Sequence, residues 1–291
     1  MKVIIRADAN KNIGQGHVMR CLSVCDALRE NGHECLFVCA KDTPMDLIME
    51  RGYDVYALTT SFDNMDEELA LLYYIIEEEK ADLMIIDSYY VTQFYLKAVK
   101  ELIPTAYLDD VYSFAYDVDC LINYNVYADK EKYEGMYVTE KVKTPAMIIG
   151  PAYAPLRKEF ANRNIREISE IKNIMISVGG ADPLHLAYGF AKSMAEDEFF
   201  KDKNINMILG KMEPDIDRIE SICKASDNIR YFVNISDMKA KIEESDLVIS
   251  AAGSTQYEIC ACAKPCICFS MADNQVPGGE KFVELGAFIY A

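Results

Sequence analysis

The chain has 291 residues, of which 51% are apolar, and this is enough for two domains of ordinary size. Its formal net charge of −17 comes from 30 Lys and Arg against 47 Asp and Glu. This charge argues against nucleic acid or an anionic membrane as the main partner. No apolar run approaches the ~20 residues of a membrane span, and the first residues predict a strand instead of a signal peptide. We therefore expect a cytoplasmic protein.

Residues 6–20, which read RADANKNIGQGHVMR, are the feature around which the chain is organised. They follow a short apolar run and lead into a helical pattern, which predicts the first strand-to-helix loop of an α/β domain. Gly14 and Gly16 allow backbone conformations that other residues avoid and leave room for a ligand. His17 falls on the first turn of the helix, where free N–H groups suit an anionic ligand. The sequence therefore predicts a catalytic position at His17.

Strand and helix patterns alternate through the first half of the chain. Residues 17–30 place apolar side chains on one helical face, and residues 35–40 form the next strand, so the chain begins with a βαβ unit. A second helix is expected over residues 67–79. The remaining strands are expected at residues 54–58, 83–87, 105–108, 120–123 and 147–150. This alternation is typical of an open, mostly parallel sheet.

A change of pattern near residues 150–155 predicts a domain boundary, because two prolines and a glycine precede a charged segment. We expect one Rossmann-like domain over residues 1–152 and a second over residues 153–291. Strands of the second domain are expected at residues 173–178, 206–209, 229–233, 246–250, 266–269 and 287–290. Two such domains facing each other would form a cleft lined by the carboxyl ends of both sheets, where ligands of this architecture bind.

Loops of the second domain carry further candidate residues. Gly179 and Gly180 follow its first strand and allow either the close approach of a phosphate or a tight turn. Ser254 and Thr255 stand before a helix, where their hydroxyls could hold a diphosphate. Glu258 lies one turn further on and could accept hydrogen bonds from sugar hydroxyls. The alternative for this junction is a helix cap with a first-turn acid.

No motif of the sequence points to a bound cofactor or metal. Neither half contains a full G-x-G-x-x-G or a Walker sequence, so nicotinamide dinucleotides and ATP are not favoured. Four of the ten cysteines, at positions 260, 262, 266 and 268, follow the spacing C-x-C-x3-C-x-C. This group lacks the C-x2-C pairs and the histidine of typical zinc sites. We interpret these cysteines as packed thiols, with a metal site as the alternative.

Taken together, these segments resemble the UDP-2,4-diacetamido-2,4,6-trideoxy-β-L-altropyranose hydrolases of pseudaminic acid biosynthesis. The opening signature, residues 6–20, is the most specific part of the resemblance. The other segments that carry it are residues 85–89, 108–110, 150–160, 178–180, 250–258 and 273–275. The resemblance covers most of the chain and implies a GT-B-like α/β fold with two Rossmann-like domains whose parallel sheets face each other across a cleft.

The resemblance also implies a reaction, namely metal-independent, inverting hydrolysis of the UDP-sugar to UDP and a free 2,4-diacetamido sugar, without a cofactor. On this basis His17 activates the attacking water. The residues implied at the sugar are Asn10, Gly14, Gly16, Tyr89, Arg157, Asn274 and Gln275. The residues implied at UDP are Gly179, Gly180, Phe232, Val233, Ser254, Thr255 and Glu258, with uracil read by the main chain near Phe232 and Val233.

Other functions remain open at this stage. A GT-B glycosyltransferase would use His17 on an acceptor hydroxyl, and a nucleotide-sugar sensor would bind UDP without turnover. His17 could also serve only to cap or pack the start of its helix. The pathway of the hydrolases connects the chain to flagellin glycosylation, and the expected partner is the UDP-sugar alone, without nucleic acid or membrane. A monomer is the working expectation, although the sequence does not determine the oligomeric state.

Overall fold

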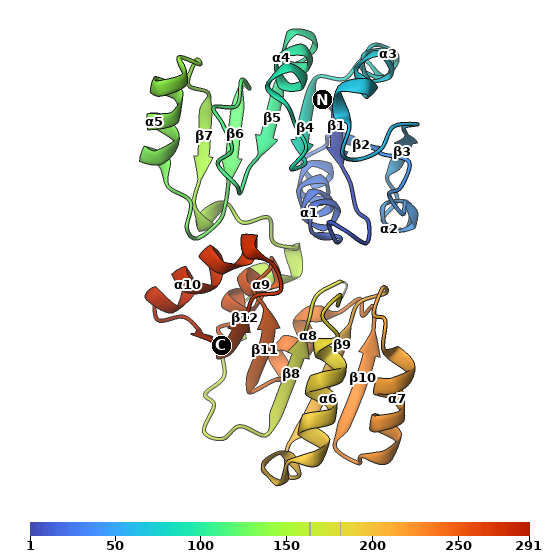
Figure 1. The fold of residues 1–291 in the computed structure, drawn as a ribbon, viewed down its shortest axis with the longest axis vertical. Coiled ribbons are helices and arrows are strands. Elements are labelled where there is room, and N and C mark those ends of the chain that lie inside the picture. The colour runs from blue at the N-terminus through green and yellow to red at the C-terminus, as the bar shows by residue number, and fades with distance from the viewer. Residues whose placement is uncertain (163, 181) are drawn as a thin grey trace. The chain divides into compact units, whose positions relative to one another are not determined.

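The structure is a computed structural model that describes residues 1–162, 164–180 and 182–291. The chain divides into two compact units, Met1–Pro155 and Leu156–Ala291. The sequence placed the start of the second domain at residue 153, but the short 3-10 turn η2 (Pro151–Tyr153) and the two residues after it belong to the first unit. The parallel α/β fold predicted from the sequence is confirmed in both units (Figure 1).

In the first unit, whose residues are all described, seven parallel strands form one sheet in the order β3-β2-β1-β4-β5-β6-β7. The strands are β1 (Lys2–Ala7), β2 (Glu34–Cys39), β3 (Asp54–Ala57), β4 (Leu83–Asp87), β5 (Thr105–Leu108), β6 (Cys120–Asn123) and β7 (Ala146–Ile149). The helices are α1 (Gly16–Glu30), α2 (Asp46–Glu50), α3 (Leu69–Glu79), α4 (Gln93–Leu102) and α5 (Lys130–Glu140), and the 3-10 turn η1 (Met65–Glu68) precedes α3.

The central strand β1 is covered on both faces, which explains its unbroken apolar sequence. Ile4 belongs to a core cluster that includes side chains of α3 and α4. Val3 and Ile5 point to the opposite face, because side chains alternate along a strand. There α1 packs on the sheet and buries Val18 and Leu22, among other apolar residues.

Within the described part of the second unit, six parallel strands form a sheet in the order β10-β9-β8-β11-β12-β13. The strands are β8 (Asn173–Ser177), β9 (Asn204–Leu209), β10 (Ile229–Val233), β11 (Leu247–Ala251), β12 (Cys266–Phe269) and β13 (Ile289–Tyr290). The helices are α6 (Leu186–Glu196), α7 (Ile216–Ala225), α8 (Met238–Glu244), α9 (Thr255–Ala261) and α10 (Val276–Glu284). Three 3-10 turns, η3 (Lys158–Ala161), η4 (Glu198–Phe200) and η5 (Asp273–Gln275), complete this unit.

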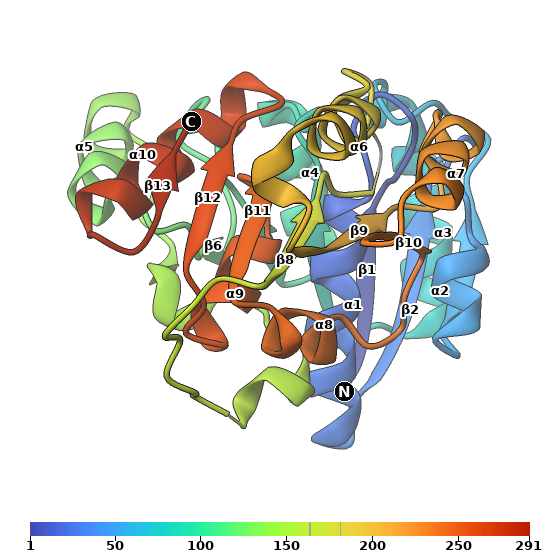
Figure 2. The ribbon, with the colours of Figure 1, turned by 90° about the horizontal axis from the view of Figure 1, so that it is seen from below.

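Helices cover both faces of the second sheet. Figure 2 shows α6 and α7 on one face, with α8 and α9 on the other. Ile174 and Ile176 of β8 and Ile205 and Met207 of β9 belong to a buried cluster that includes side chains of α6 and α7. The next residues along each strand point toward the α8 face, because side chains alternate between the two faces of a sheet.

Each sheet has one point where the strand order reverses. In the first unit β1 lies between β2 and β4, and Ala7 at its carboxyl end is in register with Asp87. In the second unit β8 lies between β9 and β11, and Ser177 is in register with Ser250. Loops that diverge at such a point leave a crevice beyond the strand ends, which is where α/β sheets bind ligands. Several predicted site residues, among them His17, Gly179 and Ser254, follow these strands.

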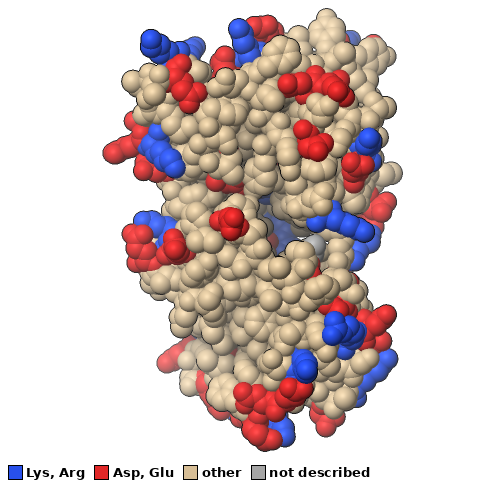
Figure 3. All heavy atoms as spheres, viewed as in Figure 1, with Lys and Arg blue, Asp and Glu red and all other residues tan. Residues whose placement is uncertain are grey.

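The surface carries both signs of charge. On the face drawn in Figure 3, Asp and Glu side chains lie among Lys and Arg side chains. Among the described residues, no helix has both the length and the apolar character that crossing a membrane requires.

Candidate functional site

The loop after β1 is closed on itself by backbone hydrogen bonds. The N–H of Gly14 donates to the carbonyl of Asn10 at 2.9 Å, and the N–H of Asn10 donates back to Gly14 at 3.2 Å. Gly14 has a φ of 72°, a left-handed conformation that favours glycine, as the sequence predicted. The same expectation for Gly16 is wrong, because Gly16 is the first residue of α1 and has no such φ. Gly16 leaves open space, since among the described residues no atom beyond its chain neighbours and the backbone of its own helix turn lies within 4 Å of where a Cβ would be.

His17 lies on the first turn of α1, as predicted, and is only 4% exposed. Its Nδ1 is 2.5 Å from Oδ1 of Asp87, the last residue of β4. The two meet because β1 and β4 are neighbours, so the loop that follows β1 lies beside the carboxyl end of β4. The ring of Tyr89 packs edge-on against the imidazole, with the ring centroids 4.5 Å apart. The candidate base is therefore held on two sides.

Asp87 determines which nitrogen of the His17 imidazole carries the proton. A carboxylate only accepts hydrogen bonds, so the N–H at Nδ1 of His17 donates a hydrogen bond to Asp87, and Nε2 is the nitrogen able to take a proton from water. Asp87 is fully buried, and burial alone would raise its pKa. The charge of Arg20 and the contact with His17 outweigh burial and hold the pKa of Asp87 well below its usual value. Asp87 is therefore a carboxylate at any pH near neutrality.

Arg20 connects His17 and Asp87 to a second carboxylate. Its Nε donates to Oδ2 of Asp87 at 2.5 Å, and its Nη2 donates to Oδ1 of the same residue. Its Nη1 donates to Oδ2 of Asp110 at 3.1 Å, and the hydroxyl of Tyr89 also donates to that oxygen, at 3.0 Å. Sequence reasoning did not assign Asp87, Arg20 or Asp110 to the site, although all three lie in segments that carry the family resemblance. The sequence did contain one signal for Asp87, which is an acidic residue at the end of an otherwise apolar strand pattern.

Asn10, predicted at the sugar, has a structural task in the loop. Its Oδ1 accepts hydrogen bonds from the N–H groups of Asn12 at 2.8 Å and Ile13 at 3.1 Å. Its Nδ2 is buried and has no partner among the described residues. An unpaired buried amide is costly, so this donor is available to a ligand that reaches the loop.

Gly179 and Gly180 follow β8, and their position depends on a third glycine. Gly179 has a φ of 91°, which favours glycine. Gly210, the residue after β9, packs directly against Gly180, since a Cβ on Gly210 would lie 2.2 Å from the carbonyl oxygen of Gly180. Gly210 is a residue that sequence reasoning missed, because its contact joins loops after two different strands.

The junction after β11 places Ser254 just before α9, with Thr255 and Glu258 on its first turn. Ser254 makes no side-chain cap hydrogen bond, so the capping alternative for its hydroxyl is not what this structure shows. Glu258 forms an ion pair with Arg157, with Nη2 2.9 Å from Oε1. Burial raises the pKa of Glu258, and the positive charge of Arg157 limits that rise. Two residues that the resemblance implied at different parts of the substrate are thus in direct contact.

The remaining predicted residues lie on three segments of the second unit. Asn274 and Gln275 are in η5, which follows β12, and Oε1 of Gln275 accepts a hydrogen bond from the N–H of Met271 at 2.9 Å. Val233 is the last residue of β10 and Phe232 precedes it. The contacts of these residues with sugar and uracil stay predictions.

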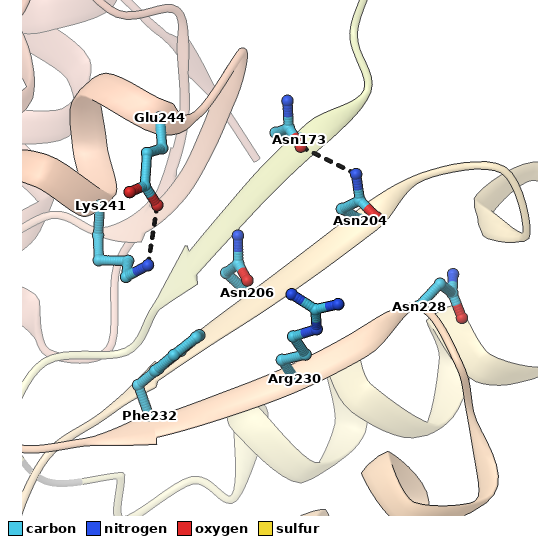
Figure 4. Close-up of a pocket in the computed structure, with 8 residues that line it drawn as sticks. All are labelled: Asn173, Asn204, Asn206, Asn228, Arg230, Phe232, Lys241 and Glu244. Atoms are coloured by element: carbon cyan, nitrogen blue, oxygen red, sulfur yellow. Dashed lines mark hydrogen bonds and ion pairs between the residues drawn. The ribbon is translucent and has the colours of Figure 1, made fainter.

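The ring of Phe232 lines a polar pocket of about 440 Å³ on the α8 face of the sheet (Figure 4). The residues around it are Asn173, Asn204, Asn206, Asn228, Arg230, Phe232, Lys241 and Glu244. Several of them stand at the amino ends of β8, β9 and β10, whereas the loops predicted to hold UDP follow the carboxyl ends of their strands. The pocket therefore shares Phe232 with the predicted UDP residues, although most of its lining stands away from the glycine loop and the junction after β11.

The cysteines with the C-x-C-x3-C-x-C spacing lie on α9, at its end and on β12. Cys262, Cys266 and Cys268 are buried and Cys260 is exposed. Among the residues that the structure describes, no three His, Cys, Asp or Glu side chains gather so as to hold a metal ion.

No protein-family model matches the chain. The structure is similar to that of MurG from Acinetobacter baumannii, with a TM-score of 0.64 and 14% identity, over 100% of this chain and 85% of that one. The chain has the GT-B fold. This likeness confirms the GT-B fold expected from the sequence.

Relatives in sequence confirm the resemblance noted from the motifs. The UDP-2,4-diacetamido-2,4,6-trideoxy-beta-L-altropyranose hydrolase of Campylobacter jejuni is 29% identical over 262 residues, which cover 89% of this chain and 87% of that protein. An uncharacterized protein of Methanocaldococcus jannaschii, MJ1062, is also 29% identical, over 89% of this chain. This GT-B chain spans only 53% of the length of that archaeal protein. Together the relatives and the GT-B fold support a role in nucleotide-sugar chemistry.

Proposed function

We propose that this chain is a UDP-sugar hydrolase acting on UDP-2,4-diacetamido-2,4,6-trideoxy-β-L-altropyranose. The observation that carries the proposal is the contact of Nδ1 of His17 with Asp87 at 2.5 Å, which leaves Nε2 as a proton acceptor. A buried carboxylate that orients a histidine is the arrangement of a general base. The proposed substrate is the one named for the similar Campylobacter jejuni hydrolase.

In the proposed reaction His17 acts on the attacking water and UDP is the leaving group. Nε2 of His17 takes a proton from water as the water oxygen bonds to the anomeric carbon. The bond from that carbon to the UDP oxygen breaks, UDP leaves with the electron pair, and the configuration inverts. General-base catalysis of this kind contributes typically ~10²- to 10⁴-fold to a rate.

The leaving group is assigned to the second unit. Its growing negative charge would be stabilised by N–H groups of the Gly179–Gly180 loop and by the hydroxyls of Ser254 and Thr255. Glu258 would accept hydrogen bonds from the ribose. Because α9 has only seven residues, we assign this stabilisation to the loop and its hydroxyls instead of to a long helix dipole.

The test is incubation of the purified protein with the UDP-sugar and no acceptor. We expect stoichiometric UDP and free sugar, with inversion visible by NMR in the first turnovers and with no loss of activity in EDTA. UDP release that waits for an added acceptor would instead establish a glycosyltransferase, which the likeness to MurG makes the second candidate. UDP binding with no product under either condition would establish a sensor. A cytoplasmic location and a link to flagellin glycosylation stay predictions.

A further inference from the structure

Arg157 and Glu258 form an ion pair that uses only one oxygen of the carboxylate. Arg157 stands immediately before η3, and Glu258 lies on the first turn of α9. Nε and Nη2 of Arg157 lie 3.1 and 2.9 Å from the same carboxylate oxygen, Oε1 of Glu258. Among the described residues, none donates a hydrogen bond to the other oxygen, Oε2. The strongest arginine–carboxylate pairs are bidentate and use both carboxylate oxygens. The pair of Arg157 and Glu258 uses one oxygen and leaves the other for a ligand.

Arg157 is itself held in place. Its Nη1 lies 3.1 Å from Oε1 of Glu159, and its guanidinium lies over the ring of Phe160, 5.1 Å from the centroid. The side chains of Arg157 and Glu258 are only 12% and 15% exposed. With its guanidinium fixed by these two neighbours, Arg157 restricts the carboxylate of Glu258 to one orientation.

We propose that Arg157 is a positioning residue for nucleotide binding, which fixes Glu258 through Oε1 so that Oε2 accepts hydrogen bonds from the two ribose hydroxyls of a uridine nucleotide. The inference rests on the proposed function, because it takes the junction after β11 as the UDP site. It assigns Arg157 to the ribose side through Glu258, whereas the family resemblance implied a place at the sugar.

The pair also sets the charge of Glu258. Burial favours the neutral acid, and Arg157 is the positive group that opposes burial. The other titratable groups that interact with Glu258 are Glu159, beside Arg157, and Cys262, at the end of α9. Neither supplies positive charge. Removing Arg157 would therefore raise the pKa of Glu258 further, and a protonated carboxyl is a poorer acceptor for ribose hydroxyls.

A double-mutant cycle on the full chain separates positioning from direct contact. UDP affinity is measured by titration calorimetry at several pH values between 6 and 8 for the wild type, Arg157→Ala, Glu258→Gln and the double variant. We expect each single variant to bind UDP about tenfold more weakly, as the loss of one good polar contact implies. The double variant should be no weaker than Glu258→Gln within about twofold, because Arg157 acts through Glu258.

The pH dependence gives a second, independent signal. The deficit of Arg157→Ala relative to wild type should grow as the pH falls, because the raised pKa of Glu258 lets it take up a proton. Comparing the variants at each pH cancels the titration of UDP itself. The ratio of Glu258→Gln to the double variant should not change with pH, since neither has a carboxylate at position 258. Arg157→Lys, which restores the charge, should recover part of the affinity and most of the wild-type pH profile.

Glu170→Gln is the matched control, because its ion pair with Lys172 is exposed and involves neither Arg157 nor Glu258. Its UDP affinity should stay within about twofold of wild type, and circular dichroism should show all variants folded. Full UDP affinity in Arg157→Ala would overturn the inference while leaving the proposed function standing. Additive losses in the double variant would overturn it too, because they place Arg157 on the ligand itself. A wild-type chain that does not bind UDP would overturn the proposed function as well.

Discussion

Nδ1 of His17 lies 2.5 Å from Oδ1 of Asp87, although the two residues are 70 positions apart in the chain. They meet because β1 and β4 are neighbours where the order of the first sheet reverses. The contact turns a histidine at a helix start into an oriented proton acceptor, and it makes the role of His17 testable.

Replacing His17 by asparagine should abolish most turnover while leaving UDP affinity unchanged, because UDP is assigned to the second unit. The expected loss in kcat is on the order of 10²- to 10⁴-fold. His33→Asn, in the turn after α1, is the matched control and should keep wild-type kcat. Normal turnover in His17→Asn would remove the general-base assignment, whatever the relatives suggest.

Asp87→Asn should show a pH-dependent loss of stability. The pKa of Asp87 is lowered in the folded state, so the stability it contributes is present above the unfolded value of about 3.9 and is lost as the pH falls toward the folded value. At pH 7 the variant leaves the buried guanidinium of Arg20 with Asp110 as its remaining carboxylate partner, and it should lose at most about 3–5 kcal/mol of unfolding free energy. The difference from wild type should shrink below about pH 4.

Urea unfolding followed by circular dichroism at pH 7 and pH 3.5 measures that difference. Glu134→Gln is the control, because its ion pair with Lys130 is exposed and should contribute no more than about 0.5 kcal/mol. A constant difference between Asp87→Asn and wild type across this pH range would show that Asp87 does not carry the lowered pKa.

Glu258→Ala should weaken UDP binding about tenfold without changing the fold, because it deletes the proposed acceptor for the ribose hydroxyls. Glu284→Ala, on the exposed side of α10, removes an acid of equal size and should leave UDP affinity unchanged. Fluorescence or calorimetric titration with UDP measures both. Equal affinities for the two variants would exclude Glu258 from the nucleotide site.

Gly210→Ala should weaken UDP binding and destabilise the second unit together. The added Cβ would lie 2.2 Å from the carbonyl oxygen of Gly180, so the backbone of the glycine loop must move. Crowding of this kind costs typically ~1–3 kcal/mol. Gly189→Ala in α6 is the matched control, because its Cβ meets nothing within 4 Å and alanine in a helix should stabilise by roughly 0.5–1 kcal/mol. Unchanged UDP affinity in Gly210→Ala would separate the glycine loop from the nucleotide.

The sequence by itself determined the local structure. Apolar runs bounded by glycine, proline and charged residues placed the strands within a few residues, because strands buried on both faces must be continuously apolar. His17 was found because a glycine loop between a strand and a helix is also a local pattern of the sequence. The predicted backbone conformation of Gly16 was wrong, because the sequence does not show at which residue a helix begins.

Only the tertiary structure decided which residues meet. Asp87 joins His17 because β4 lies beside β1, and Gly210 supports Gly180 because β9 lies beside β8. Arg157 meets Glu258 across a separation of 101 positions. Each contact depends on strand order and on packing between segments distant in sequence, and periodicity carries no information about either. The sequence thus located the candidate base, and the fold supplied the carboxylate that orients it.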